Sequence, residues 1–202
     1  MTKNQFSTNG KSPSYRSPLT FIMEFLKHPM QVGSLIPSSR FIQQRILQAA
    51  EIAKAHTIVE LGPGTGGTTR TILSKMRPDA KLLSIEVNPQ FHNWISTIQD
   101  KRFIAHLGSA NELRTILKQY DLQAPSVIVS GIPFSNIDEQ TAAHLIAEID
   151  ELLAPNGRFV AYQVRNRVAE LCTPVMGNGR RKTELRNFPP MRIYSWEKNG
   201  KS

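Results

Sequence analysis

The stretch VELGPGTGG (residues 59–67) decides how this sequence folds. It continues the apolar run TIVEL (57–61), which predicts a buried strand, and leads into TTRTILSKM (68–76), which predicts a helix. Gly62, Gly64 and Gly67 match the spacing G-x-G-x-x-G, and Gly66 adds a fourth glycine. Glycines let a backbone turn tightly and approach a ligand closely. The stretch therefore predicts a nucleotide-type cofactor loop, with a purely structural turn as the alternative.

The same alternation of strand and helix continues along the chain. Further apolar strands are predicted at 81–87, 102–107, 126–131 and 158–164, and the clearest helix between them at 138–153. Near-continuous apolar strands that alternate with helices predict an α/β fold, a mostly parallel sheet with helices on both faces. Residues 192–196 predict a closing strand and 181–188 its hairpin partner, which makes seven strands.

The 202 residues suit a single domain with a sizeable core. Residues 1–16 are polar and predict a disordered tail, so the domain spans 17–202. Within it, residues 17–54 precede the first strand, and helices are predicted there at 18–28 and 38–54.

Composition and charge narrow the classes of function. Cys172 is the only cysteine, and no histidines stand at metal-ligand spacing, so neither an internal disulfide nor a metal centre is expected. No apolar run is long enough for a signal peptide or a membrane span. The net charge of +9 is concentrated at the two ends, since residues 158–202 carry ten Lys or Arg against three acids. Such ends suit a polyanionic partner, either nucleic acid or an anionic membrane.

Two glutamates indicate which cofactor the loop takes. Glu86 ends the second strand, where a carboxylate accepts the hydroxyl hydrogens of a ribose. Glu60 stands directly before the loop, where it would repel the pyrophosphate of a dinucleotide and attract a cation.

An acidic residue followed by LGPGTG resembles the first motif of class I S-adenosylmethionine-dependent methyltransferases, which have a Rossmann-like fold. Their cofactor carries a sulfonium and an amino group but no phosphate. The resemblance implies that Glu60 and the loop hold its methionine end and that Glu86 holds its ribose. It also implies an adenine site after the third strand. The implied cofactor residues are Glu60, Gly62, Gly64, Gly66, Glu86, Ser109 and Ala110.

The segment VSGIPFSN (129–136) resembles the acceptor motif of two methyltransferase families. Ribosomal RNA adenine dimethyltransferases place Asn or Asp where this chain has Ser130, and they add a C-terminal RNA-binding domain. Soluble bacterial phospholipid N-methyltransferases resemble the chain over nearly its whole length, notably in VGSLIPSSR (32–40) and SGIPFSN (130–136). This second resemblance implies methylation of phosphatidylethanolamine, in one or successive steps towards phosphatidylcholine.

Methyl transfer to an amine needs alignment and desolvation, without a covalent intermediate. Phe134 is predicted to stabilise the developing cation through its ring, the alternative being that it only fills the core at the end of the strand. The carbonyls of Ser130 or Gly131 are predicted to orient the amine. Tyr162 is predicted to contact the headgroup, and Tyr15 to close the site.

The resemblance also places Ser38 and Ser39 near the cofactor, although they equally suit the start of the second helix.

The phospholipid family further implies that the first helix docks on a membrane, the alternative being a helix packed over the cofactor site. Residues 19–30 are more apolar than a one-faced surface helix needs. The predicted membrane-binding residues are Phe21, Ile22, Phe25, Lys27, Arg180, Arg181 and Lys182. The expected location is cytoplasmic, on the inner face of the bacterial membrane. An RNA adenine methyltransferase and a non-catalytic binding module of the same fold remain the alternatives.

Overall fold

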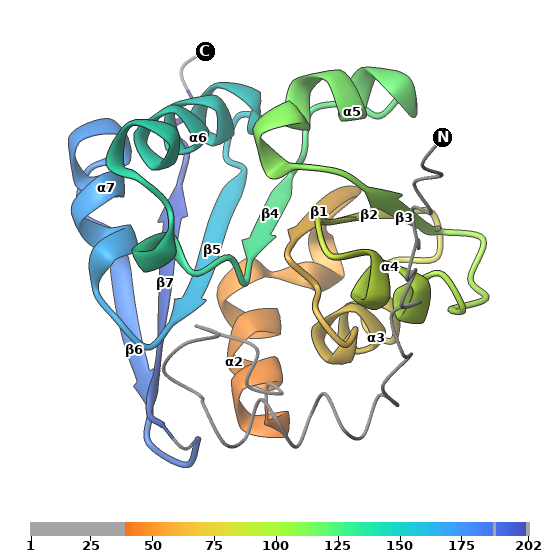
Figure 1. Ribbon diagram of the computed structural model, residues 1–202, viewed down its shortest axis with the longest axis horizontal. Coiled ribbons are helices and arrows are strands. Elements are labelled where there is room, and N and C mark those ends of the chain that lie inside the picture. Colours follow the sequence, from red (N-terminus) through yellow and green to blue (C-terminus); the bar gives the residue numbers. More distant parts are fainter. Residues whose placement is uncertain (1–38, 188, 201–202) are drawn as a thin grey trace, which may run out of the picture. The chain divides into compact units, whose positions relative to one another are not determined.

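The computed structural model of the chain describes residues 39–187 and 189–200. Its centre is a seven-stranded sheet with the order β3-β2-β1-β4-β5-β7-β6 (Figure 1). Neighbours run parallel from β3 to β5, whereas β7 is antiparallel to both β5 and β6. The strands are β1 (Thr57–Leu61), β2 (Lys81–Glu86), β3 (Phe103–Leu107), β4 (Val127–Ser130), β5 (Arg158–Gln163), β6 (Arg180–Glu184) and β7 (Met191–Glu197). The predicted mostly parallel, seven-stranded α/β fold is confirmed.

Helices cover both faces of this sheet (Figure 1). One buried cluster packs α5, α6 and α7 on the first face, and a second packs α2 and α3 on the other. The helices are α2 (Arg40–Ala50), α3 (Gly67–Leu73), α4 (Pro89–Ile95), α5 (Leu113–Gln119), α6 (Glu139–Leu152) and α7 (Arg167–Met176), with 3-10 turns η1 (Ile52–Lys54), η2 (Ala110–Glu112) and η3 (Phe134–Asn136).

The strand order explains where a ligand can bind. β1 pairs with β2 on one side and with β4 on the other. The strand order therefore reverses at β1: β2 and β3 follow on one side of it, and β4 and β5 on the other. In open sheets of this kind, ligands bind at the carboxyl ends of the strands where the strand order reverses, which here is beside β1 and β4. This is the edge at which the glycine loop and the VSGIPFSN segment both begin.

Two sequence predictions differ from the structure. Helix α7 was not predicted, because Pro174 and polar residues hide the apolar spacing of Val168, Leu171 and Cys172, all of which are buried. The predicted helix 38–54 ends earlier, at Ala50, because Glu51 adopts a left-handed conformation with φ 47°. The predicted helix 18–28 and the tail 1–16 lie outside the described residues.

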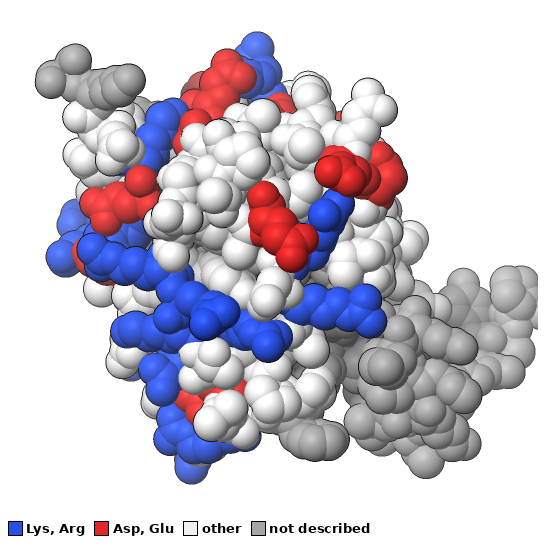
Figure 2. All heavy atoms as spheres, turned by 90° about the vertical axis from the view of Figure 1, so that its left-hand side faces the viewer, with Lys and Arg blue, Asp and Glu red and all other residues white. Residues whose placement is uncertain are grey.

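Charge is distributed unevenly over the surface. Figure 2 faces the side of the molecule that carries β6 and α7, and Lys and Arg gather across its lower half. Most of the Asp and Glu visible there lie in the upper half. Because β4 and β5 point downward in Figure 1, the basic half lies towards the carboxyl ends of these strands.

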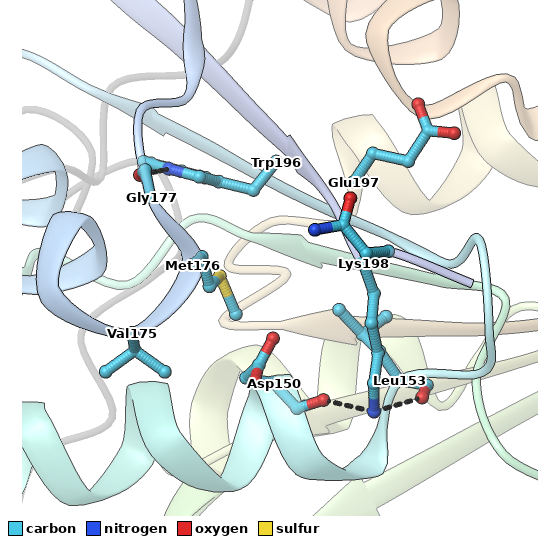
Figure 3. A pocket seen from close by; sticks show the side chains of 9 residues that line it. Asp150, Leu153, Val175, Met176, Gly177, Trp196, Glu197 and Lys198 are labelled. Carbon is cyan, nitrogen blue, oxygen red and sulfur yellow. Dashed lines mark hydrogen bonds between the residues drawn. The ribbon is translucent and has the colours of Figure 1, made fainter. Parts of the chain in front are cut away.

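A lysine joins the end of α6 to the end of β7 at the opposite edge of the sheet. The Nζ of Lys198 donates hydrogen bonds to the carbonyls of Asp150, Glu151 and Leu153 at 2.7–2.9 Å. Figure 3 shows the bonds to Asp150 and Leu153. These are carbonyls that the helix itself leaves without partners. A hollow of about 450 Å³ lies beside this contact, lined by Trp196 and its neighbours, at the edge away from the glycine loop.

Replacement of this lysine tests how much the cap stabilises the fold. Lys198→Met removes a cation from the negative end of α6 and leaves its carbonyls unpaired, so we expect the free energy of unfolding to fall by about 1–3 kcal/mol. Urea unfolding followed by circular dichroism measures it. The matched control is Lys54→Met, which removes only an exposed pair with Glu51 and should change stability little. Equal losses in the two variants would contradict the assignment.

Candidate functional site

The glycine loop between β1 and α3 has the backbone that the sequence predicts. Gly62, Gly64 and Gly66 have φ values of 71°, 56° and 80°, a region that side chains disfavour. At Gly66 there is also no room for a side chain, because an added Cβ would lie 2.9 Å from the Cγ2 of Ile95. The loop therefore presents bare backbone at the carboxyl end of β1, as a closely approaching ligand requires.

Glu86 holds this loop in place. Its Oε2 accepts a hydrogen bond from the Gly64 N–H at 3.0 Å, and its Oε1 accepts one from the Asn88 N–H at 2.9 Å. The residue is 5% exposed. Each carboxylate oxygen has a second lone pair, so two ribose hydroxyls can bind without releasing the loop. The ribose contact itself stays a prediction.

Glu60 is completely buried on β1. Its Oε2 accepts hydrogen bonds from the Thr69 hydroxyl at 2.6 Å and the Ser84 hydroxyl at 2.7 Å. Its Oε1 has no hydrogen-bond partner among the described residues. Burial, reinforced by the nearby charge of Glu86, raises the pKa of the Glu60 carboxyl to about 7.

An unpaired buried carboxylate oxygen beside a glycine loop fits a cationic ligand group. S-adenosylmethionine supplies an amino group and a sulfonium, and when bound it provides an activated methyl group. Glu60, Glu86 and the glycine loop are the residues that would hold it. Its phosphate-free chemistry also suits a site that contains two buried acids.

The predicted adenine side lies at the end of β3. Ser109 caps the turn η2 by accepting a hydrogen bond from the Asn111 N–H, and Ala110 is partly exposed beside it. The Gly108 N–H donates to the carbonyl of Glu86 at 3.0 Å, which joins this segment to the ribose side. Val87, directly after Glu86, is 73% exposed.

The acceptor segment lies against the glycine loop. The Gly131 N–H donates to the carbonyl of Leu61 at 2.9 Å, and Ile132 contacts the position where a Cβ of Gly62 would stand. The buried Ser130 hydroxyl accepts the Ile132 N–H at 3.2 Å, which shapes the turn. The structure thus brings the predicted cofactor and acceptor motifs together.

Tyr162 contributes a hydroxyl to this junction. An added Cβ on Gly131 would lie 2.4 Å from the Tyr162 Oη and 2.9 Å from the Gly62 carbonyl oxygen. Glycine is therefore required at 131, because the tyrosine and the glycine loop already fill the space. Beside it, the Gln163 amide donates to the Ile132 carbonyl at 2.6 Å. Gln163 was not predicted as a site residue, although a polar side chain at the end of an apolar strand was a signal for it.

Phe134 lies inside the apolar core and is 0% exposed, in the same cluster as Leu145 and Ile146 of α6. Its packing function is evident, and its predicted contact with the acceptor amine stays a prediction.

The remaining predicted residues are placed as follows. The Ser39 side chain caps α2 by accepting the Ile42 N–H, so one of its two predicted uses is present and its cofactor contact stays a prediction. Arg180, Arg181 and Lys182 are exposed on the edge strand β6, away from the glycine loop. The others lie outside the described residues: Tyr15, Phe21, Ile22, Phe25, Lys27 and Ser38.

The raised pKa of Glu60 predicts a pH dependence of cofactor binding. In the free protein the carboxyl is mostly protonated at pH 6 and mostly ionised at pH 8, and a bound cation favours the ionised form. Affinity for S-adenosylmethionine should therefore rise about tenfold between pH 6 and pH 8, as isothermal titration calorimetry measures.

The same raised pKa predicts how stability depends on pH without cofactor. The free energy of unfolding should fall as pH rises from about 4.5 towards 7, because Glu60 ionises at a lower pH in the unfolded chain than in the folded one.

Glu60→Gln is the control for this effect, because it keeps the shape of the side chain and cannot ionise. Its affinity should be lower and nearly independent of pH. An unchanged pH profile in this variant would assign the dependence to another group.

The crowding at Gly131 predicts a specific loss of activity. Gly131→Ala should displace Tyr162 or the glycine loop, and we expect methyl transfer to fall by at least about tenfold, with a loss of stability of about 1–3 kcal/mol. Adding Tyr162→Phe should restore part of the stability, because it removes the closest contact atom. A Gly131→Ala variant as stable and as active as the parent would contradict the packing.

Comparison with known proteins points to methyltransferases. The family model for ribosomal RNA adenine dimethylase matches residues 27–146, more than half of the chain. An ornithine lipid N-methyltransferase of Singulisphaera acidiphila is 28% identical over 183 residues, which cover 86% of this chain and 92% of that protein. A ribosomal RNA small subunit methyltransferase A of Mycolicibacterium vanbaalenii is 28% identical over 162 residues, 75% of this chain but 48% of that protein.

Solved structures share the fold at low sequence identity. The N-methyltransferase NodS of Bradyrhizobium japonicum superposes with a TM-score of 0.66 at 14% identity, covering 82% of this chain and 99% of that one. The same enzyme in complex with S-adenosyl-l-homocysteine gives a TM-score of 0.63 at 13% identity, covering 85% and 97%. The matched family is the one whose fourth motif differs from this sequence at Ser130. The chain belongs to the ribosomal RNA adenine dimethylase family and is a class I S-adenosylmethionine-dependent methyltransferase.

Proposed function

We propose that this enzyme transfers methyl groups to the primary amine of a membrane lipid headgroup, with phosphatidylethanolamine as the acceptor. The reaction proceeds once or in successive steps towards phosphatidylcholine. The family takes its description from enzymes that methylate ribosomal RNA. Membership does not fix the acceptor, because proteins that share a fold and a cofactor site can methylate different acceptors.

The observation that carries this proposal is the environment of Ser130. The related RNA enzymes place Asn or Asp at this position, and a side-chain amide or carboxylate suits the amino group of a flat base. Here the Ser130 side chain is short and fully buried, and its hydroxyl accepts the Ile132 N–H. It therefore offers an incoming adenine little of the polar contact that the RNA enzymes supply.

A lipid amine makes different demands on the site. It arrives as an ammonium and must lose a proton before its lone pair attacks the methyl group. Backbone carbonyls at Ser130 or Gly131 orient its N–H groups, and Tyr162 contacts the headgroup. The ring of Phe134 stabilises the cation that forms on the amine. Because this ring is buried in the structure, acceptor binding must expose one of its faces. Tyr15 closes the site in this proposal.

The similarity to a lipid enzyme supports the same acceptor class. The ornithine lipid N-methyltransferase aligns with more of this chain than the ribosomal RNA methyltransferase does, and with nearly twice the share of the relative's own length. Ornithine lipid, like phosphatidylethanolamine, has a primary amine. In the described part of the chain, no helix is both long and apolar enough to cross a bilayer. We propose that the enzyme works from the cytoplasm, at the inner face of a bacterial membrane.

An acceptor competition tests the proposal. The purified protein is incubated with methyl-labelled S-adenosylmethionine and vesicles of phosphatidylethanolamine and phosphatidylglycerol, vesicles of ornithine lipid and phosphatidylglycerol, or ribosomal RNA. We expect label in phosphatidylethanolamine, identified by chromatography of the lipid extract. The Gly131→Ala variant provides the background for each acceptor.

Label in ornithine lipid alone would support lipid N-methylation but would make ornithine lipid the acceptor in place of phosphatidylethanolamine. Label in RNA with none in either lipid would overturn the proposal in favour of base methylation. Cofactor binding without transfer to any acceptor would support a non-catalytic binding module.

A further inference from the structure

The strands β6 and β7 form a hairpin (residues 180–197) at one border of the sheet. Its first strand begins with three consecutive basic residues, Arg180, Arg181 and Lys182, all exposed. None of the three forms an ion pair with a residue in the described ranges 39–187 and 189–200. Their positive charge is therefore not neutralised by an acid within these ranges.

The turn of this hairpin carries an exposed apolar residue. Leu185 follows β6 directly and is 76% exposed, the highest value among the large apolar residues that the structure describes. A leucine in this position cannot bury its side chain within the described part of the chain. A single exposed leucine is unremarkable by itself, but here it extends from a run of cations.

The hairpin turn lies at the same edge of the sheet as the acceptor segment. Because β7 is antiparallel to β5, its first residues pair with the carboxyl end of β5, with Arg192 opposite Gln163. Gln163 in turn holds the Ile132 carbonyl of the acceptor segment. A flat partner that covers the hairpin turn therefore also faces the side from which the acceptor arrives.

Glu184 attaches the hairpin turn firmly to α2. Its carboxylate accepts hydrogen bonds from Arg186 at 2.7 and 2.9 Å and from Arg45 of α2 at 2.6 Å. The Arg186 guanidinium also lies 4.1 Å above the ring of Phe41. The one acid of the strand is thus neutralised by two guanidinium groups, and the surface is held in place before a partner binds.

We propose that the β6–β7 hairpin docks on an anionic lipid surface, with Arg180, Arg181 and Lys182 at the phosphates and Leu185 inserted at the boundary of the acyl chains. Phosphate groups in RNA would attract the same cations. RNA offers no apolar layer to an aliphatic side chain at the tip, however, whereas a membrane interface does. The inference rests on the proposed lipid function for its purpose, and it adds the surface that orients the acceptor edge towards the bilayer.

Vesicle binding tests this surface independently of catalysis. Full-length protein is sedimented with sucrose-loaded vesicles of phosphatidylethanolamine and phosphatidylglycerol. The Arg181→Glu/Lys182→Glu double variant should bind at least about tenfold more weakly, and Leu185→Ser several-fold more weakly. The wild type should also bind more weakly as salt increases.

Matched controls carry the same chemical changes at the opposite edge. Lys75→Glu/Lys118→Glu reverses two exposed lysines, and Val175→Ser removes a half-exposed apolar side chain at the end of α7. Both should bind vesicles as the wild type does. If the thermal unfolding midpoints of all variants lie near that of the wild type, the losses of vesicle binding are not caused by unfolding.

The outcomes separate docking from the proposed function. Hairpin variants that bind vesicles like the wild type, or controls that lose as much binding, would overturn the docking surface even if the enzyme methylates lipid. Hairpin-dependent binding to RNA without binding to vesicles would overturn it in favour of nucleic acid. Hairpin-dependent vesicle binding without lipid methylation would support docking and refute the acceptor.

Discussion

The hydrogen bond from the Gly64 N–H to the Glu86 carboxylate is the contact on which the site depends. It joins the loop after β1 to the end of β2 and holds the left-handed backbone of Gly64 in place. Glu60 lies two residues before Gly62, and one of its carboxylate oxygens has no hydrogen-bond partner in the part of the chain that the structure describes. Two buried carboxylates so close together would destabilise a phosphate site. They suit a cofactor whose reactive end is a cation.

The second constraint is the close approach of the acceptor segment to the glycine loop. Gly131 has no side chain because Tyr162 and the Gly62 carbonyl occupy that space. Methyl transfer requires donor and acceptor to be aligned within a few ångströms, and such contacts leave little freedom to the two loops. Gln163 and Ser130 hold the turn from two sides. The predicted acceptor segment is thus held at a junction of β1, β4 and β5.

The basic hairpin stands at the border of the sheet, yet its turn points to the same edge as this junction. The reversal of β7 produces this arrangement, because an antiparallel last strand brings the preceding turn to the carboxyl ends of the parallel strands. Under the two proposals, this member of a family described by RNA adenine methylation works at a lipid interface.

The sequence by itself determined the alternation of strands and helices, the glycine loop and the two acidic positions, because these depend on local spacing and backbone conformation. It did not reveal α7, whose apolar positions surround Pro174, and it named Tyr162 without its contact to Gly131. Only the tertiary structure decided which side chains meet at the carboxyl ends of the strands. It paired Glu86 with Gly64, placed Gln163 against Ile132 and buried Phe134 in the core. These contacts join residues far apart in the chain, and the order of strands in the sheet, which no local pattern encodes, brings them together.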